Sequence, residues 1–162
     1  MAASTTEIIT LARPLTLAGS PPVWPDGVHL APLKTSDAAA IHALLVRAYA
    51  NGYGTVQPDW LDWFEWLTTD PEFDQKLCFL ARTDAGDDIV GFCLVWTSAF
   101  VKDLVVEPDM HGTGIGTALL ATAIAEMRGR GHARLRLKVD GRNLAARRFY
   151  ERMGFAPEAT GP

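Results

Sequence analysis

The chain has 162 residues, of which 48% are hydrophobic and 21% are charged, and its formal net charge is −4. This length allows one domain with a complete hydrophobic core and is too short for two domains of ordinary size. The negative net charge argues against general nucleic-acid binding, and no apolar run approaches the ~20 residues that span a bilayer. We therefore expect one cytoplasmic domain without a nucleic-acid or membrane partner.

The cysteines and the first residues narrow the setting further. Cys78 and Cys93 lie in apolar runs without metal-ligand spacing, which predicts neither a disulfide framework nor a metal site. The chain begins with polar residues, and Arg13 and Pro14 interrupt the apolar stretch that follows, unlike a signal peptide. Because prolines and glycine are frequent up to residue 27, we expect residues 1–27 to form a leader and residues 28–162 to form the domain.

Beyond the leader, the hydrophobic pattern predicts alternating strands and helices. Apolar residues at every second position predict strands, and apolar residues three or four apart predict helices. Strands are expected at 28–33, 77–82, 89–96, 100–106 and 134–139, the second and third forming a hairpin. Helices are expected at 38–49, 58–67, 116–128 and 144–153, the last capped by Asn143 and ended by Gly154. This order predicts a mixed α/β (α+β) fold with helices around a mostly antiparallel sheet.

The most informative segment joins the strand at 100–106 to the next helix. Pro108 ends the strand, and Gly112, Gly114 and Gly116 follow before the helix begins. Because glycine has no Cβ, successive main-chain N–H groups can turn toward one anion, and the helix N-terminus adds partial positive charge. Each helix-end interaction is worth only about 0.3 to 1 kcal/mol, so several donors must converge on a polyanion. The loop therefore predicts a diphosphate site.

Two other phosphate-binding folds fit this segment less well. A dinucleotide-binding fold shares the order strand, glycine loop, helix, strand and then Asp140, but its third glycine would fall where Thr117 or Leu119 stands. A P-loop requires Gly-Lys-Ser or Gly-Lys-Thr, which the chain lacks. The preceding hairpin pattern also favours an antiparallel sheet.

Two segments, residues 106–116 and residues 143–155, together resemble the signature motifs of the GNAT N-acetyltransferase superfamily. The family's usual Gln or Arg at the start of the glycine loop is His111 here, a change that affects a side-chain contact more than the main-chain cradle. The resemblance extends over residues 28–155. It implies the GNAT fold, a splayed sheet in which two neighbouring strands part to admit the pantetheine arm of acetyl-CoA.

The resemblance also implies which residues bind acetyl-CoA. Main-chain groups of the strand would contact the pantetheine arm, those of the loop would hold the diphosphate, and the last helix would face the thiol end. The residues so implied are Leu104, Val105, Val106, His111, Gly112, Thr113, Gly114, Ile115, Gly116, Thr117, Asn143 and Tyr150.

N-acetyl transfer requires a proton acceptor and a proton donor. A primary amine with a pKa near ~10.4 is almost wholly protonated at pH 7, so its proton must leave before its lone pair can attack a thioester. Tyr150 matches the family's general acid, which protonates the departing thiolate. Asp103 and Glu107 share one face of the strand by period two and are candidates for the base, with ordered water as a further route. We favour Asp103.

These side chains also have ordinary structural interpretations. Tyr150 shares a helical stripe with Ala146 and Met153, as a core residue would, and Asp103 could be a solvated carboxylate at a strand end. His111 is more simply a loop side chain than a base or ligand. Aromatic residues cluster before and within the second helix, where packing is their usual role, yet we expect at least one ring to border the acceptor site. They are Tyr49, Tyr53, Trp60, Trp63 and Trp66.

The sequence thus predicts an acetyl-CoA-dependent N-acetyltransferase that acts on a primary amine of a small molecule. Lys102 and Asp103 stand where the similar polyamine and diamine acetyltransferases usually carry Glu-Asp, so Lys102 separates this chain from that subgroup. A non-catalytic acyl-CoA-binding module and an acetyltransferase for protein lysines or N-termini are the alternatives.

The resemblance leaves one sheet edge without a strand. Domains of this kind usually continue past Phe155 with a turn and a last strand, whereas this sequence ends at Pro162. Because bare edges promote aggregation, we expect residues 8–17 or a neighbouring subunit of a homodimer to cover that edge. Pro14 has no N–H and restricts such a strand to an edge position.

Overall fold

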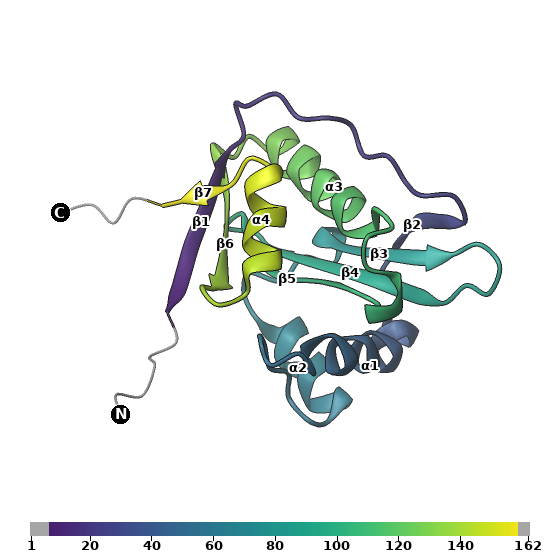
Figure 1. Cartoon of the computed structure of the whole chain (residues 1–162). Coiled ribbons are helices and arrows are strands. Elements are labelled where there is room, and N and C mark those ends of the chain that lie inside the picture. The colour runs from purple at the N-terminus through teal and green to yellow at the C-terminus, as the bar shows by residue number, and fades with distance from the viewer. Residues whose placement is uncertain (1–6, 159–162) are drawn as a thin grey trace.

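The computed structural model describes residues 7–158, so the polar start of the chain and residues 159–162 lie outside the description (Figure 1). Its strands are β1 (Ile8–Pro14), β2 (Val28–Pro32), β3 (Cys78–Thr83), β4 (Ile89–Trp96), β5 (Phe100–Val106), β6 (Arg134–Asp140) and β7 (Ala156–Pro157). Its helices are α1 (Ala38–Tyr49), α2 (Trp60–Thr69), α3 (Ile115–Gly129) and α4 (Leu144–Arg152). The predicted mixed α/β class is confirmed.

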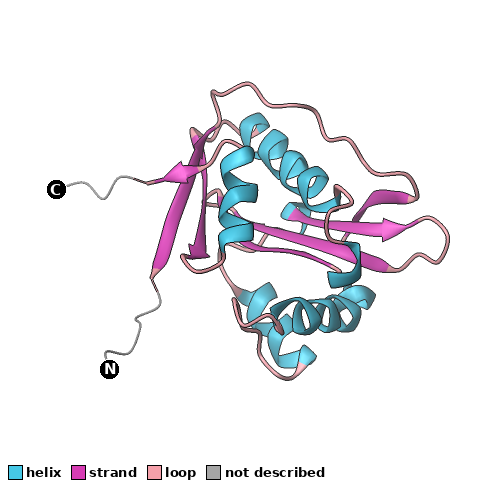
Figure 2. Ribbon diagram, viewed as in Figure 1, coloured by secondary structure: helices cyan, strands magenta, loops and turns pink. Residues whose placement is uncertain are grey.

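The strands form one sheet in the order β2-β3-β4-β5-β6-β1-β7. Neighbouring strands are antiparallel except β5 and β6, which are parallel and pair only at Phe100 with Arg136 and Val101 with Leu137. In Figure 2, α1 and α2 lie on one side of the sheet, and α3 and α4 lie on the other. The fold is therefore an open, mostly antiparallel sheet covered by helices on both faces.

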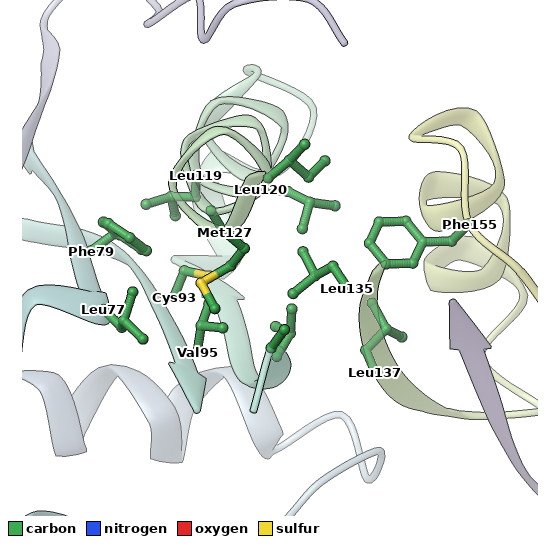
Figure 3. Packing of buried hydrophobic residues seen from close by; sticks show 14 of the residues in the cluster. Leu77, Phe79, Cys93, Val95, Leu119, Leu120, Met127, Leu135, Leu137 and Phe155 are labelled. Atoms are coloured by element: carbon green, nitrogen blue, oxygen red, sulfur yellow. The ribbon is translucent and has the colours of Figure 1, made fainter. Parts of the chain in front are cut away.

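Each face of the sheet has its own hydrophobic core. Leu119, Leu120 and Met127 of α3 pack on Cys93 and Val95 of β4 (Figure 3). The other core lies under α1 and α2, and its buried members are Leu33, Ile41, Leu44, Leu45, Trp63, Leu67, Cys78, Leu80, Ile89, Phe92, Leu94, Trp96 and Val105. Because β4 lies between both cores, all its residues are buried, which explains its uninterrupted apolar sequence.

Local sequence signals set the ends of two helices. Asp59 accepts a hydrogen bond from the Asp62 N–H at 3.0 Å, so α2 begins at Trp60, two residues later than the pattern predicted. Asn143 caps α4 as predicted, its side-chain oxygen accepting from the Ala146 N–H at 3.2 Å. Both caps satisfy N–H groups that have no partner inside the helix.

The leader contributes β1, which pairs with β6 along its whole length, from Ile8 opposite Asp140 to Pro14 opposite Arg134. The sequence had suggested an edge position for this strand. Instead, β1 is an inner strand, because β7 pairs with its other side at Leu11 and Ala12. Pro14 is compatible with that position since it ends β1, beyond the reach of β7. Within the described residues, the chain itself supplies the strand next to β6.

No helix within residues 7–158 is both long enough and apolar enough to cross a bilayer.

Candidate active site

A candidate site opens where β5 and β6 separate. Their short parallel pairing is extended by one hydrogen bond, from the Arg136 N–H to the Ala99 carbonyl at 3.0 Å. Beyond it the strands part, and a cavity of about 730 Å³ lies between them, bounded by the glycine loop and α4. We call this cavity the strand cleft.

The glycine loop presents a row of unpaired main-chain donors to the strand cleft. The Met110 N–H bonds to the Glu107 carbonyl at 2.8 Å, and the Ala118 N–H bonds to the Gly114 carbonyl at 3.0 Å. Between them, no N–H of residues 111–117 donates to any acceptor within residues 7–158. Unpaired amides at a helix N-terminus form a site for an anion.

Two glycines make this loop conformation accessible. Gly112 and Gly114 have φ values of +79° and +98°, in the left-handed region that side chains with a Cβ rarely adopt. A Cβ at either position would meet no atom within 4 Å, so the space in front of both residues is open. The loop therefore keeps its amides accessible to a ligand.

Gly91 on β4 holds α3 close to the sheet, a role that sequence reasoning missed. A Cβ there would lie 2.8 Å from Leu119 Cδ1 and 2.9 Å from Ile115 Cγ2. Real Cβ atoms do not approach so closely, so only glycine allows the first turns of α3 to pack here. The N-terminal end of the helix, with its free amides, is thereby fixed against the strands.

The main chain of β5 lines the other side of the strand cleft. The Glu107 N–H bonds to the Val90 carbonyl of β4 at 2.8 Å, and bonding toward one neighbour alternates along an antiparallel strand. Val105 therefore directs its main-chain groups toward β4, whereas Leu104 and Val106 direct theirs into the gap. Both residues can add hydrogen bonds to an extended ligand.

Tyr150 projects from α4 into the strand cleft. Its ring packs against Phe149 and Phe155, with centroid distances of 5.2 and 5.8 Å, and lies among the cleft residues. Its hydroxyl has no hydrogen-bond partner within residues 7–158. Burial, reinforced by the Asp103 carboxylate, raises the pKa of Tyr150 well above its usual range. The phenol thus keeps its proton at neutral pH and can donate it.

A second cavity, of about 480 Å³, lies between β5 and the helices α1 and α2, and we call it the acceptor pocket. Its lining residues are Leu45, Thr55, Val56, Gln57, Trp63, Trp66, Lys102 and Asp103. Lys102 also lines the strand cleft, so the two cavities are adjacent. Trp63 and Trp66 of α2 are the aromatic residues that line this cavity.

Among the described residues that line the acceptor pocket, Asp103 is the one carboxylate. Its side chain is only 5% exposed, accepts a hydrogen bond from the Tyr49 hydroxyl and lies 3.7 Å from the Lys102 ammonium. Burial and the neighbouring Asp103 carboxylate raise the pKa of Tyr49, so Tyr49 remains the donor of this hydrogen bond at neutral pH. Asp103 is therefore a structured buried group, not a solvated strand end.

A β-bulge places Lys102 and Asp103 in the same pocket. Leu94 of β4 lies opposite Asp103, but Val95 lies opposite Val101, so Lys102 is an extra residue on β5. In a regular strand, consecutive side chains point to opposite faces, and a bulge interrupts that alternation. Two adjacent residues of opposite charge can therefore line one cavity.

Glu107, the other carboxylate that the sequence suggested, lies elsewhere. It follows the end of β5 and forms a bidentate ion pair with Arg47 of α1, the shortest contact being 2.6 Å from Nη2 to Oε2. It lines neither the strand cleft nor the acceptor pocket. The two-residue period placed Asp103 and Glu107 on the same face of the strand. In the structure, Arg47 of α1 binds Glu107 and does not bind Asp103.

A family model described as the acetyltransferase (GNAT) family matches residues 38–155. The chain belongs to this family. Two curated relatives named mycothiol acetyltransferase, from Thermobispora bispora and Salinispora tropica, are 33% and 36% identical over 159 and 162 residues. The matches cover 90% of this chain but 52% and 50% of those proteins. The chain thus spans about half the length of the curated relatives it matches.

Solved structures share this fold. A GCN5-related N-acetyltransferase from Sphaerobacter thermophilus superposes with a TM-score of 0.80 at 23% identity, covering 94% of this chain and 49% of that one. The ribosomal-protein-S18-alanine N-acetyltransferase from Escherichia coli superposes with a TM-score of 0.65 at 27% identity, covering 82% and 79%. The first similarity concerns the fold alone.

In this GNAT domain, most residues that the sequence assigned to acetyl-CoA line the strand cleft. They are Leu104, Val105, Val106, His111, Gly112, Gly114, Ile115, Gly116, Thr117, Asn143 and Tyr150. Thr113 does not, because its hydroxyl turns back to the Met110 carbonyl at 2.6 Å. His111 stays exposed, with Nε2 3.3 Å from the Val106 carbonyl oxygen.

Sequence reasoning left Tyr49 and Lys102 without roles in the GNAT site. Tyr49 was one of five clustered aromatic residues, and nothing in its spacing distinguishes a hydrogen bond to Asp103 from ordinary packing. The charge of Lys102 is evident in the sequence, but the direction of its side chain depends on the bulge. Of the other aromatic residues, Tyr53 lines the strand cleft, and Trp60 lines neither cavity.

Proposed function

We propose that this GNAT domain is an acetyl-CoA-dependent N-acetyltransferase that acetylates the primary amine of a small molecule by direct attack on the thioester. The observation that carries the proposal is the joint arrangement of the two cavities. Free loop amides and Tyr150 lie along the strand cleft, and Asp103 lines the adjoining pocket. A pocket of about 480 Å³ suits a small molecule.

The strand cleft has the donors that coenzyme A requires. The amides of residues 111–117 would bind the diphosphate, and the space in front of Gly112 and Gly114 leaves room for its oxygens. Main-chain groups of Leu104 and Val106 would bind the amides of the pantetheine arm as another strand would. The thiol end would then lie toward Tyr150.

Acetyl-CoA supplies the acetyl group, and the residues of the chain handle the protons. Asp103 accepts a proton from the ammonium group, directly or through water, and frees the lone pair that forms the new C–N bond. When the C–S bond breaks, Tyr150 donates its proton to the sulfur. The amine loses two protons in all: one of them restores the proton of Tyr150, and the other is released to solvent.

The Tyr150→Phe variant tests the acid. Acid–base assistance contributes about 10² to 10⁴-fold, so we expect the variant to lose at least about tenfold in kcat, measured by thiol release from acetyl-CoA. Its affinity for coenzyme A, measured by calorimetry, should stay near that of the wild type because the ring is retained. An unchanged kcat would remove Tyr150 from the mechanism.

Paired carboxamide variants test the base. We expect Asp103→Asn to lower kcat by about tenfold or more, whereas Glu107→Gln should change kcat/KM by less than about threefold, since Glu107 lines neither cavity. Circular dichroism and thermal melting of both variants control for folding. If Glu107→Gln were the more damaging change, the assignment of the base would be reversed.

A second candidate acceptor is the N-terminus of a protein. The similarity to the ribosomal-protein-S18-alanine N-acetyltransferase, at 27% identity over 82% of this chain, favours it. Competition between small amines and peptides with free N-termini distinguishes the two acceptor classes. Calorimetric binding of acetyl-CoA without transfer to any amine or peptide would instead identify a non-catalytic acyl-CoA-binding module.

A further inference from the structure

Lys102 and Asp103 are the charged residues of the acceptor pocket, and their charges are opposite. Every other described lining residue is apolar or neutral: Leu45, Thr55, Val56, Gln57, Trp63 and Trp66. A ligand in this pocket therefore meets one cation and one anion side by side against aromatic walls.

The Lys102 ammonium lies beside Trp66, another residue that lines the pocket. It lies 5.7 Å from the centroid of the Trp66 ring, and its side chain is 32% exposed. Within residues 7–158, Asp103 is the only carboxylate within 4 Å of it, at 3.7 Å, and Asp103 also accepts from Tyr49. Since an ammonium has three donors, Lys102 retains hydrogen-bonding capacity for a ligand.

The spacing of the two charges suits one small zwitterion. By standard bond lengths, the nitrogen and a carboxylate oxygen of an α-amino acid are about 3 Å apart. A ligand of this size can place its ammonium on Asp103 and its carboxylate on Lys102, whose charged atoms are 3.7 Å apart. A diamine or polyamine would instead bring a second positive charge toward Lys102, which is unfavourable.

We propose that the acceptor of this domain is an amine with a carboxylate on the adjacent carbon, and that Lys102 is the residue that selects the carboxylate. The inference rests on the proposed acetyl transfer and adds the substrate class. Asp103 binds the amine and Lys102 binds the carboxylate, so the reacting nitrogen is held at the boundary between the two cavities.

The experiment compares matched acceptors on the full chain with acetyl-CoA. The probes are the common α-amino acids, their α-carboxamides and the corresponding amines without a carboxyl group, with mass detection of the acetylated product. A hydrogen bond between two charged groups is among the stronger polar contacts, so we expect the best amino acid to have a KM at least about tenfold below that of its carboxamide. Lys102→Met, which keeps most of the side-chain stem, should remove this difference.

Two further variants complete the design. Lys76→Met, which removes a lysine that lines neither cavity, should leave the preference unchanged. Lys102→Glu should invert it and favour a diamine such as 1,4-diaminobutane. Equal or better use of carboxamides by the wild type, or an unchanged preference in Lys102→Met, would overturn the proposal.

Binding separates this proposal from the proposed activity. Calorimetry of an amino acid and its carboxamide, titrated into the protein saturated with coenzyme A, reports recognition without chemistry. If neither binds, or both bind equally, the Lys102 proposal fails, whatever the turnover. If the amino acid binds better in the wild type than in Lys102→Met while no amine is acetylated, the proposed activity fails and the recognition by Lys102 stands.

Discussion

Among single residues, Tyr49 has the most direct influence on the proposed base. Its hydroxyl donates to the buried Asp103 carboxylate, and its ring also lines the strand cleft. A buried carboxylate without a donor would be costly, so Tyr49 both stabilises Asp103 and fixes the direction of its free oxygen. Tyr49 is thus a positioning residue that links α1 to the chemistry on β5.

Tyrosine ionisation should limit the stability of this protein at high pH. The folded-state pKa values of Tyr49 and Tyr150 are raised by burial above about 10, the value of an unfolded tyrosine. The unfolded state therefore releases these protons first, so stability is complete below about pH 10 and falls as the pH rises further. The expected loss is up to about 1.4 kcal/mol per pH unit for each tyrosine.

Urea unfolding between pH 8 and 11 checks this prediction, and Tyr150→Phe provides the comparison. Because the variant has one titrating phenol fewer, its stability should fall less steeply with pH than that of the wild type. Parallel curves would show that Tyr150 ionises equally in the folded and unfolded states.

At the level of secondary-structure elements, the junction of the glycine loop and α3 combines a left-handed backbone conformation with ligand access. Gly114 precedes α3 with φ +98°, and alanine there would cost roughly 1 to 2 kcal/mol in the left-handed region. Its methyl group would also enter the open space in front of the free amides. We expect Gly114→Ala to raise the Kd for coenzyme A by about tenfold or more, since several converging amides are misaligned.

Gly131 offers a matched control for this change. It has φ +87° after the C-terminal end of α3, its Cβ position is equally open, and it lies outside both cavities. Gly131→Ala should therefore cost a similar unfolding free energy while leaving the Kd for coenzyme A unchanged. Similar losses of affinity in both variants, by calorimetry, would mean that strain alone weakens binding.

Helices and strands were predictable from the sequence where local pattern and burial agree. The bounds predicted for the helix at 38–49 match α1, and Leu135, Leu137 and Val139 of β6 are buried as their alternation indicated. The bulge at Lys102 was not predictable, because it is defined by pairing with β4. Local periodicity contains no information about that partner.

The candidate site likewise has features that the sequence predicted and features that depend on tertiary contacts. The free amides and Tyr150 follow from two motifs, each short and continuous in the sequence. The separate fates of Asp103 and Glu107 depend on Tyr49 and Arg47 of α1, more than fifty positions away along the chain. Such contacts arise only when α1 packs on β5, so spacing along the strand alone could not separate the two carboxylates.

For the whole molecule, β1 acts as a structural part of the domain and not as a loose leader. Arg13 is buried and donates from Nε to the Met153 carbonyl at the end of α4 at 2.8 Å. Arg128 of α3 donates to the Leu15 and Leu17 carbonyls at 2.8 and 2.7 Å. These bonds connect β1 and the segment after it to both helices of one face, including the helix that carries Tyr150.

Alanine substitutions within β1 test this integration. Leu11 is 4% exposed and belongs to the core under α3, so Leu11→Ala should lower the free energy of unfolding by about 2 to 5 kcal/mol. Ile8 is 55% exposed, and Ile8→Ala should cost less than about 1 kcal/mol. Denaturant unfolding should remain a single transition in both variants. A separate early transition would mean that β1 detaches independently.

The position of β1 also answers the question of the uncovered sheet edge. Since a strand of the same chain pairs with β6 from Ile8 to Pro14, the argument for a neighbouring subunit at that edge no longer applies. The domain proposed from the sequence, residues 28–162, would lack this strand. We therefore include β1 in the folded unit.

The strand order has a consequence for biosynthesis. Ile8 leaves the ribosome well before its partner Asp140, more than a hundred residues later in the sequence, is synthesised. The apolar stretch of β1 must stay unpaired while most of the domain emerges, an interval in which nascent chains are vulnerable to aggregation and chaperones commonly bind. Arg13, within that stretch, carries a charge throughout this interval and can help to keep the waiting segment soluble.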